Sequence, residues 1–152
     1  MINDQEFLQG AAFLRLINYG SRITIIHTSL IHPSMYLVET DSSKSAVLFK
    51  ISKKPKSAWS FTLSSQEELA LDTLRSKYPN ISVFIAFICH KDGICCIAEN
   101  RLWSVLDRDA GVDGKHISVS RQPRGSYHVS GPGRQQIEQS VPQSDWLRIF
   151  FK

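Results

Sequence analysis

A run of lysines follows the apolar residues of one expected strand and ends beside a tryptophan. Lys50, Lys53, Lys54 and Lys56 lie within seven residues, and Trp59 comes three residues later. Ammonium groups attract the phosphates of a nucleic acid, and an aromatic ring beside them can stack on a base. This cluster is a candidate contact for a phosphate backbone. The alternative is a strand end whose lysines simply reach solvent, with the tryptophan in the core.

A second basic group lies in the segment ISVSRQPRGSYHVSGPGR, residues 117–134. Its arginines offer planar forks that suit phosphate or carboxylate. Pro123 and Gly125 predict a type I turn that holds Arg124 at the tip of a hairpin. A hairpin that contacts a polyanion and a hairpin that is merely solvated both fit this pattern. The candidate binding residues of this group are Arg121, Arg124, Tyr127 and Arg134.

The segment CHKDGICC, residues 89–96, collects side chains that could ligate a metal. The spacing lacks the C-x-x-C pair of a zinc site. A two-residue turn at residues 92–93 would pair His90 with Cys95 and Cys89 with Cys96, so the ligands would split between opposite faces of a hairpin. We therefore predict no metal site and buried, reduced thiols, with a Cys89 to Cys96 redox pair as the alternative.

Hydrophobic periodicity predicts the elements that position these groups. Helical spacing runs over residues 4–19, with Asn3 or Asp4 as its N-cap, and a second helix starts at Ser64 or Ser65 and reaches Tyr78. The almost unbroken apolar run 81–90 is typical of a central strand covered on both faces. Further segments are expected to form strands, a short helix at 100–106 and a late hairpin; the expected strands are 23–29, 35–40, 45–52, 59–63, 94–99, 116–121 and 126–130. The sequence therefore predicts a mixed α/β protein, with a mixed sheet flanked by helices and an additional C-terminal hairpin.

Composition limits the class of protein. A chain of 152 residues with 42% hydrophobic residues suffices for one domain, with a core over residues 4–106 and the hairpin and tail over 115–152. The absence of a long apolar run and of a signal-like start leads us to expect a cytoplasmic protein with no membrane partner. A net charge of +4 permits a nucleic acid partner without requiring one.

The element order and one lysine carry a resemblance to a known family. Over residues 4–98, a helix, a three-stranded meander with Lys50 late in its third strand, a helix and a strand resemble the core of the restriction-endonuclease-like, or PD-(D/E)xK, superfamily. In its active members, an acid near the second strand and an acid two residues before the lysine bind Mg²⁺, and the lysine helps to activate water. Here Leu48 precedes Lys50 by two, and Ile51 precedes Lys53 by two. The resemblance therefore implies a nuclease-like fold whose active site has been lost or moved.

From these observations we expect a nucleic-acid-binding or phosphate-binding module that is not catalytic and needs no cofactor. One alternative is an Mg²⁺-dependent nuclease with a displaced site drawn from Glu6, Glu39, Asp41 and Lys50. A four-residue loop over 41–44 would place Glu39 opposite Ala46, about 13 Å along the sheet from Lys50 at about 3.3 Å per residue. That distance is too long for one cation site.

A third alternative is a protein-interaction subunit, whose partner is another protein or a second copy of the chain. The sheet edge, or an exposed patch of the aromatic tail DWLRIFFK, residues 145–152, would then dock onto the partner.

Overall fold

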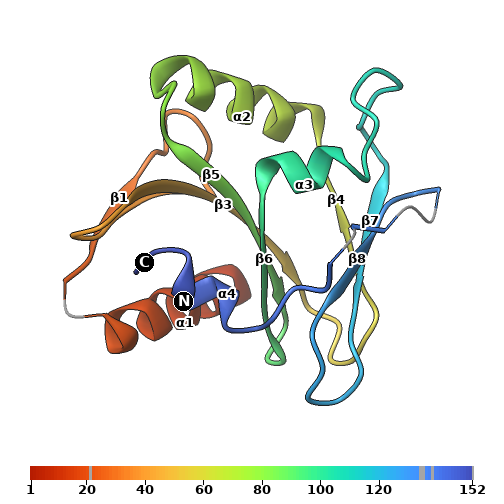
Figure 1. The fold of residues 1–152 in the computed structure, drawn as a ribbon, viewed down its shortest axis with the longest axis horizontal. Helices are drawn as coiled ribbons and strands as arrows, with labels where there is room; N and C mark the ends of the chain where they lie inside the picture. The colour runs from red at the N-terminus through yellow and green to blue at the C-terminus, as the bar shows by residue number, and fades with distance from the viewer. Residues whose placement is uncertain (21, 134–135, 138, 152) are drawn as a thin grey trace.

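The described residues of the computed structural model form eight strands and four helices (Figure 1). The structure describes residues 1–152 except 21, 134–135, 138 and 152. The helices are α1 (Asp4–Tyr19), α2 (Ser65–Lys77), α3 (Glu99–Trp103) and α4 (Asp145–Arg148). The strands are β1 (Thr24–His27), β2 (Met35–Glu39), β3 (Lys44–Ser52), β4 (Trp59–Thr62), β5 (Ser82–Cys89), β6 (Gly93–Ala98), β7 (His116–Ser120) and β8 (His128–Ser130).

Both long helices begin with side-chain caps. The Asn3 side chain accepts a hydrogen bond from the Glu6 backbone amide at 2.8 Å, which makes Asn3 the N-cap of α1. In α2, Ser64 and Glu67 form a capping box, in which each side chain accepts a hydrogen bond from the other residue's backbone amide. Local sequence therefore fixes where both helices start.

Five of the strands form one sheet, in the order β1-β2-β3-β5-β6. The strands β3 and β5 are parallel, with α2 in the connection between them, and the other three pairs are antiparallel. This mixed sheet confirms the predicted α/β class. Because β3 and β5 run in the same direction, the loops that follow them leave the sheet at the same edge.

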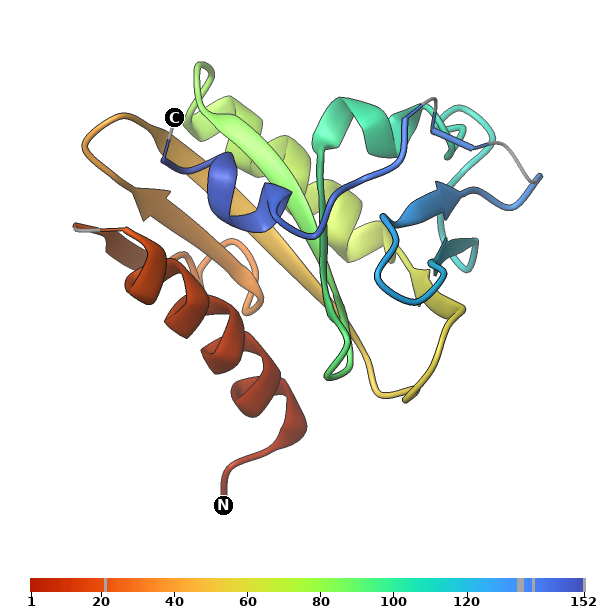
Figure 2. The same cartoon turned by 60° about the horizontal axis from the view of Figure 1, so that its bottom comes forward.

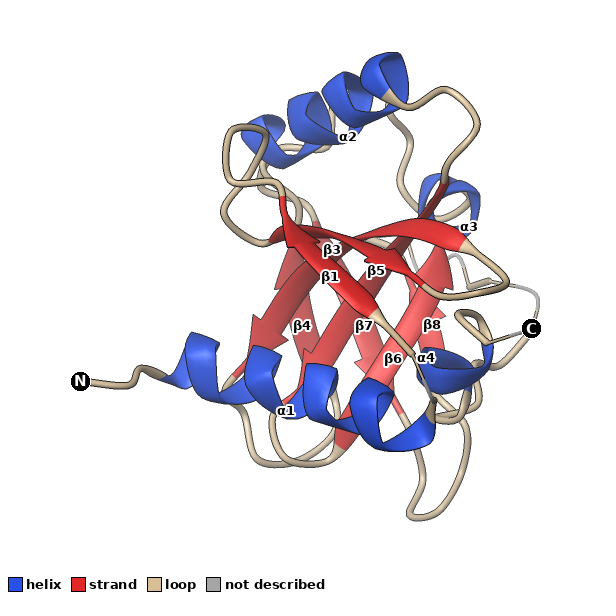
Figure 3. Ribbon diagram, turned by 90° about the vertical axis from the view of Figure 1, so that its left-hand side faces the viewer, coloured by secondary structure: helices blue, strands red, loops and turns tan. Residues whose placement is uncertain are grey.

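Helices cover both faces of this sheet: α2 and α3 lie on one side, and α1 and α4 lie on the other (Figure 3). Side chains alternate between the two faces. In β3, Ala46 and Leu48 join the apolar cluster beneath α2, whereas Val47 and Phe49 join the cluster beneath α1. The two-sided burial explains the continuous apolar runs of β3 and β5.

The predicted C-terminal hairpin exists as β7 and β8, and it is part of the core rather than an addition to it. The strand β7 pairs with β4, so that β4, β7 and β8 form a second antiparallel sheet. Trp59 and Phe61 of β4 and Ile117 of β7 belong to the same buried cluster as Leu48 of β3. The second sheet therefore closes the α2 side of the core.

Candidate nucleic-acid interface

The two basic groups, about 65 residues apart in sequence, meet at one end of the molecule. The β3–β4 loop (residues 53–58), the β5–β6 turn (90–92) and the β7–β8 loop (121–127) lie together at the lower end in Figure 1, and the turned view of Figure 2 agrees. The His90 amide donates to the Ser52 carbonyl at 3.0 Å, and the Arg121 amide donates to the Ser57 hydroxyl at 3.1 Å. We call this surface the basic edge; its cations are Lys53, Lys54, Lys56, Lys91, Arg121 and Arg124.

The lysines of the β3–β4 loop are exposed. Lys53 lies 3.5 Å from the Asp4 carboxylate at the start of α1, with both side chains largely in solvent. Such a pair contributes little stability and leaves the ammonium group accessible. Lys54 donates to the Ala58 carbonyl at 2.7 Å across its own loop. These lysines can therefore meet an anion from solvent.

The β7–β8 loop presents Arg124 at its tip, as expected. The Gly125 amide donates to the Gln122 carbonyl at 2.8 Å, which closes the predicted turn. Arg124 has φ of +64°, so the turn is of type II; the prediction of type I was wrong. The Arg124 side chain is exposed, and its guanidinium group is available to an anion.

Asp92, in the β5–β6 turn, ties this loop to the first sheet. Its carboxylate accepts hydrogen bonds from Arg121 Nε at 2.7 Å and from the Tyr127 hydroxyl at 2.9 Å. Its backbone carbonyl accepts from Gln143 Nε2 at 2.8 Å. Gly93 leaves room for these groups, since a Cβ there would collide with the Gln143 amide and the Tyr127 hydroxyl. Asp92 therefore neutralises Arg121 and orients the basic loop.

The two aromatic residues predicted to stack on bases cannot do so in this structure. Trp59 is 1% exposed and Tyr127 is fully buried. The Trp59 ring donates to the Lys54 carbonyl at 2.8 Å and packs against Tyr127 with ring centroids 6.2 Å apart. Trp59 begins β4 and Tyr127 directly precedes β8, and both rings belong to the buried cluster that the second sheet shares with Leu48 of β3. Arg134 lies outside the described residues.

Lys50 is paired with a carboxylate that the sequence analysis did not assign to it. Its ammonium group donates to both oxygens of Glu67, at 2.8 Å each, and only 19% of the lysine side chain and 8% of the glutamate side chain are exposed. Lys50 is therefore a mostly buried, neutralised cation. The signal that could have found Glu67 is the capping box, which fixes that carboxylate at the start of α2.

His32 lies near this ion pair. Burial lowers the pKa of His32, the Glu67 carboxylate raises it by a smaller amount, and Lys50 lowers it further. The Nδ1 atom of His32 accepts a hydrogen bond from the Ser34 amide at 3.1 Å, which requires an unprotonated nitrogen there. A neutral imidazole therefore accompanies the Lys50–Glu67 pair.

Two of the carboxylates proposed for a displaced nuclease site, Glu39 and Asp41, lie far from Lys50. The third, Glu6, is exposed in the first turn of α1. Glu39 pairs with Lys44 in the sheet, not with Ala46 as predicted, and the two side chains are 3.5 Å apart. Lys50 lies six positions after Lys44 along β3, about 20 Å of strand at about 3.3 Å per residue. Asp41 lies in the same distant hairpin loop, so neither carboxylate can share a cation with Lys50.

The hairpin loop explains this register. It spans residues 40–43, with the Thr40 amide donating to the Ser43 carbonyl at 2.9 Å. The side-chain hydroxyl groups of Thr40 and Ser43 also donate to the Phe150 carbonyl of the C-terminal tail, at 2.6 Å and 3.0 Å. Within the described parts of the chain, no group of three or more His, Cys, Asp or Glu side chains is placed to hold a metal ion.

The cysteines occupy a different register from the predicted one. The turn contains three residues, 90–92, so Cys89 pairs with Gly93 and Phe87 pairs with Cys95. Cys89 and Cys96 join apolar clusters on opposite faces of the sheet, which rules out the Cys89 to Cys96 pair suggested by the two-residue turn. All three thiols are free and buried, and burial raises the pKa of each.

We expect the three thiols to be unreactive in the folded protein, because a thiolate is the reactive form and burial disfavours it. Titration with a thiol reagent at pH 8 should detect no reactive cysteine in native buffer and three in denaturant. A fast-reacting thiol in native buffer would contradict this burial.

The aromatic tail is part of the core. Trp146 and Phe150 are buried against α1 and β3, and Trp146 Nε1 donates to the Ala12 carbonyl at 3.0 Å. Phe151 is half-buried and packs on Tyr19 with ring centroids 5.5 Å apart. The predicted exposed docking patch of this tail is therefore not present in the structure.

Comparisons of the chain with protein-family models, with curated proteins and with solved structures find no match in any of the three. The functional conclusion therefore rests on the geometry of the chain itself. Among the described residues, no helix has both the length and the apolar character needed to cross a membrane.

Proposed function

We propose that this protein is a nucleic-acid-binding module that contacts the phosphate backbone through the basic edge. One observation carries the proposal: the lysines of the β3–β4 loop and the arginines of the β7–β8 loop form one continuous surface, joined by the hydrogen bond from the Arg121 amide to Ser57. Clustered cations on one face are the electrostatic footprint of a polyanion site.

The balance of charge at the basic edge supports the same proposal. Its six cations face two carboxylates, Asp4 and Asp92, which pair with Lys53 and Arg121. The remaining charge is positive and exposed. The position of the edge at the ends of β3 and β5 gives the loops a rigid base, because both strands are central in the sheet.

The resemblance to the restriction-endonuclease-like superfamily is part of this proposal. Its support is the element order, in which a meander and a helix lead to β5, parallel to β3. Lys50 stands late in β3, and its carboxylate companion is Glu67 from α2. We therefore propose a nuclease-like scaffold used for binding.

Removing one cation from each loop should weaken binding. The double variant Lys56→Gln with Arg124→Gln removes both charges but keeps polar side chains that extend into solvent. Each lost phosphate contact should reduce the slope of log affinity against log salt by about 0.7 to 0.9, and at 0.1 M salt the two together should lower affinity roughly 25- to 60-fold. Fluorescence anisotropy of labelled DNA and RNA over a range of salt concentrations measures both quantities.

The matched control removes two exposed cations from the opposite end of the sheet. Lys44→Gln with Lys77→Gln changes the net charge equally, and both side chains lie near the ring of Tyr78, at 5.5 Å and 5.6 Å. If both double variants weaken binding by the same amount, net charge rather than the basic edge explains the affinity. Absence of saturable binding by the unaltered protein at low salt would contradict the proposed function.

A further inference from the structure

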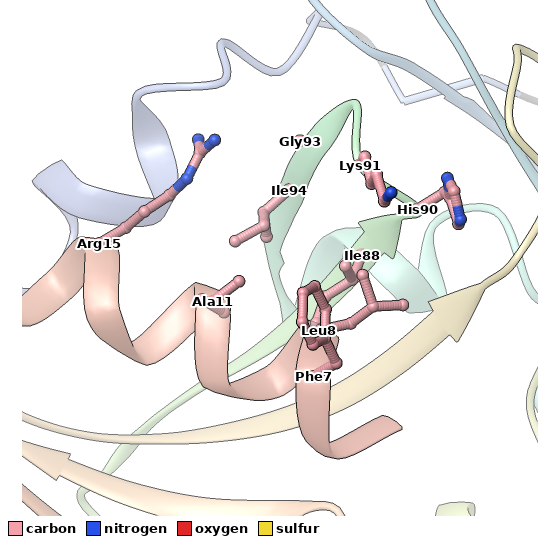
Figure 4. Close-up of a pocket in the computed structure, with 10 residues that line it drawn as sticks. Phe7, Leu8, Ala11, Arg15, Ile88, His90, Lys91, Gly93 and Ile94 are labelled. Carbon is pink, nitrogen blue, oxygen red and sulfur yellow. The ribbon is translucent and has the colours of Figure 1, made fainter. Parts of the chain in front are cut away.

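An apolar pocket lies beside the basic edge, between α1 and the β5–β6 hairpin (Figure 4). Its volume is about 200 Å³. Leu8 and Ala12 of α1 and Ile88 and Ile94 of the hairpin form its buried wall. Phe7 and Ala11 complete its α1 side, so one face of the pocket is aliphatic and its opening carries an aromatic ring.

Basic side chains stand at both ends of this pocket. Figure 4 shows Arg15 at one end and His90 with Lys91 at the other. The ten described residues that line the pocket include no carboxylate. An uncharged, flat group could occupy the apolar centre of the pocket. Anionic groups attached to it on either side could then bind Arg15 at one end and Lys91 at the other. A nucleotide inside a strand has this chemistry, because its base is flanked by two phosphates.

Phe7 is the aromatic side chain at the mouth of the pocket that faces solvent. It is 62% exposed, whereas Trp59 and Tyr127 beneath the basic edge are buried. Tyr19, the other strongly exposed aromatic residue of α1, lies three turns further along at its C-terminal end. Exposed aromatic faces beside a cationic groove are the usual platforms on which single-stranded nucleic acids stack their bases.

The pocket is continuous with the basic edge. Lys91 belongs to both, since it lines the pocket and sits in the β5–β6 turn. The Lys53 to Asp4 pair joins the β3–β4 loop to the first turn of α1, one helical turn from Phe7. A phosphate backbone lying along the basic edge therefore passes the opening of the pocket.

We propose that the preferred ligand is a single-stranded nucleic acid, one base of which enters this pocket and stacks on Phe7. This inference rests on the proposed function. A base inside a duplex is already stacked and paired and must leave the helix before it can enter. The pocket therefore favours single strands, whereas the cations of the edge attract both forms. The walls are apolar, so stacking rather than base-edge hydrogen bonding should dominate and sequence preference should be weak.

The substitution Phe7→Ala separates the pocket from the edge. We measure anisotropy with a labelled single strand of about 12 nucleotides, with its duplex, and with an abasic strand of equal length and charge. The variant should bind the single strand about 5- to 150-fold more weakly, as expected for one lost stacked base. Affinity for the abasic strand and the salt slope should stay unchanged, because no charge is removed.

Two further variants complete the test. Leu14→Ala removes another exposed apolar side chain of α1 that does not line the pocket, and it should change no affinity. Ala11→Trp keeps Phe7 but fills the pocket, and it should weaken single-strand binding as Phe7→Ala does.

Equal loss by Phe7→Ala on the normal and abasic strands, or no loss on either, would overturn the inference. The Lys56 and Arg124 double variant would still report on the basic edge in that case. The two proposals therefore fail separately.

Discussion

Replacing Glu67 with alanine is expected to lower the free energy of unfolding by about 3 kcal/mol. The substitution leaves the mostly buried Lys50 ammonium group without an anion and removes half of the α2 capping box. Breaking one side of a buried ion pair usually costs about 3 to 5 kcal/mol, and the residual exposure of Lys50 favours the lower end. For a chain of this length the melting temperature should fall by about 6 to 12 °C.

Adjacent and conservative variants separate the contributions. Glu68→Ala removes a neighbouring, half-buried glutamate whose partner Arg108 also binds Asp72 and so keeps an anion, and its cost should be about 1 kcal/mol. Glu67→Gln retains the capping box but leaves Lys50 without an anion. Adding Lys50→Met to Glu67→Gln removes the unpaired cation and should recover most of the stability that Glu67→Gln loses. Urea unfolding measures the stability of these four variants against the unaltered protein. If Glu67→Ala and Glu68→Ala are equally stable, the buried pair does not support the fold as we describe it.

A binding measurement tests the role of Lys50. Because Glu67 neutralises Lys50, the double variant Glu67→Gln with Lys50→Met should not change the salt slope of nucleic acid binding. A reduced slope would show that Lys50 itself contacts phosphate.

Replacing Asp92 with asparagine is expected to change stability and binding in opposite directions. The variant loses a charge-assisted hydrogen bond to Arg121, worth about 1.5 to 3 kcal/mol, while the asparagine oxygen can still accept from Tyr127. The charge of Arg121, whose side chain is 14% exposed, is then no longer neutralised, so the positive potential of the basic edge increases. Affinity for nucleic acid at low salt should rise, and the salt slope should steepen by about 0.7 to 0.9.

A control with the same change of net charge is Asp109→Asn, in the exposed loop between α3 and β7. That loop lies at the upper end of the molecule in Figure 1, away from the basic edge. The control should alter neither stability nor affinity strongly. A loss of affinity in Asp92→Asn at an unchanged melting temperature would contradict the proposal that Asp92 neutralises Arg121 and holds the β7–β8 loop in place.

Local sequence determined the elements of this protein. The helix predicted over residues 4–19 is α1, because apolar side chains at helical spacing and the Asn3 cap act within a few residues of one another. The central strand over 81–90 and the mixed α/β class were predicted for the same reason, since two-sided burial leaves a continuous apolar run. The presence of two basic groups was also plain from the sequence.

Tertiary structure decided the registers and the partners. The β2–β3 register depends on the tail carbonyl that holds Thr40 and Ser43, and the three-residue β5–β6 turn includes Asp92, which is held by Arg121 and Tyr127. These contacts come from segments distant in sequence, so hairpin rules alone place the strands incorrectly.

The arrangement of the candidate site likewise came from packing. The parallel pairing of β3 with β5 brings the β3–β4 loop and the β5–β6 turn to one edge, and the pairing of β4 with β7 brings the arginine loop beside them. Trp59 and Tyr127, the two aromatic residues that sequence assigned to stacking, are buried in the core that the second sheet covers, whereas Phe7 of α1 is exposed at the pocket that Lys91 also lines. Residue types show which chemistry is available, and only the sheet order shows which residues share a surface.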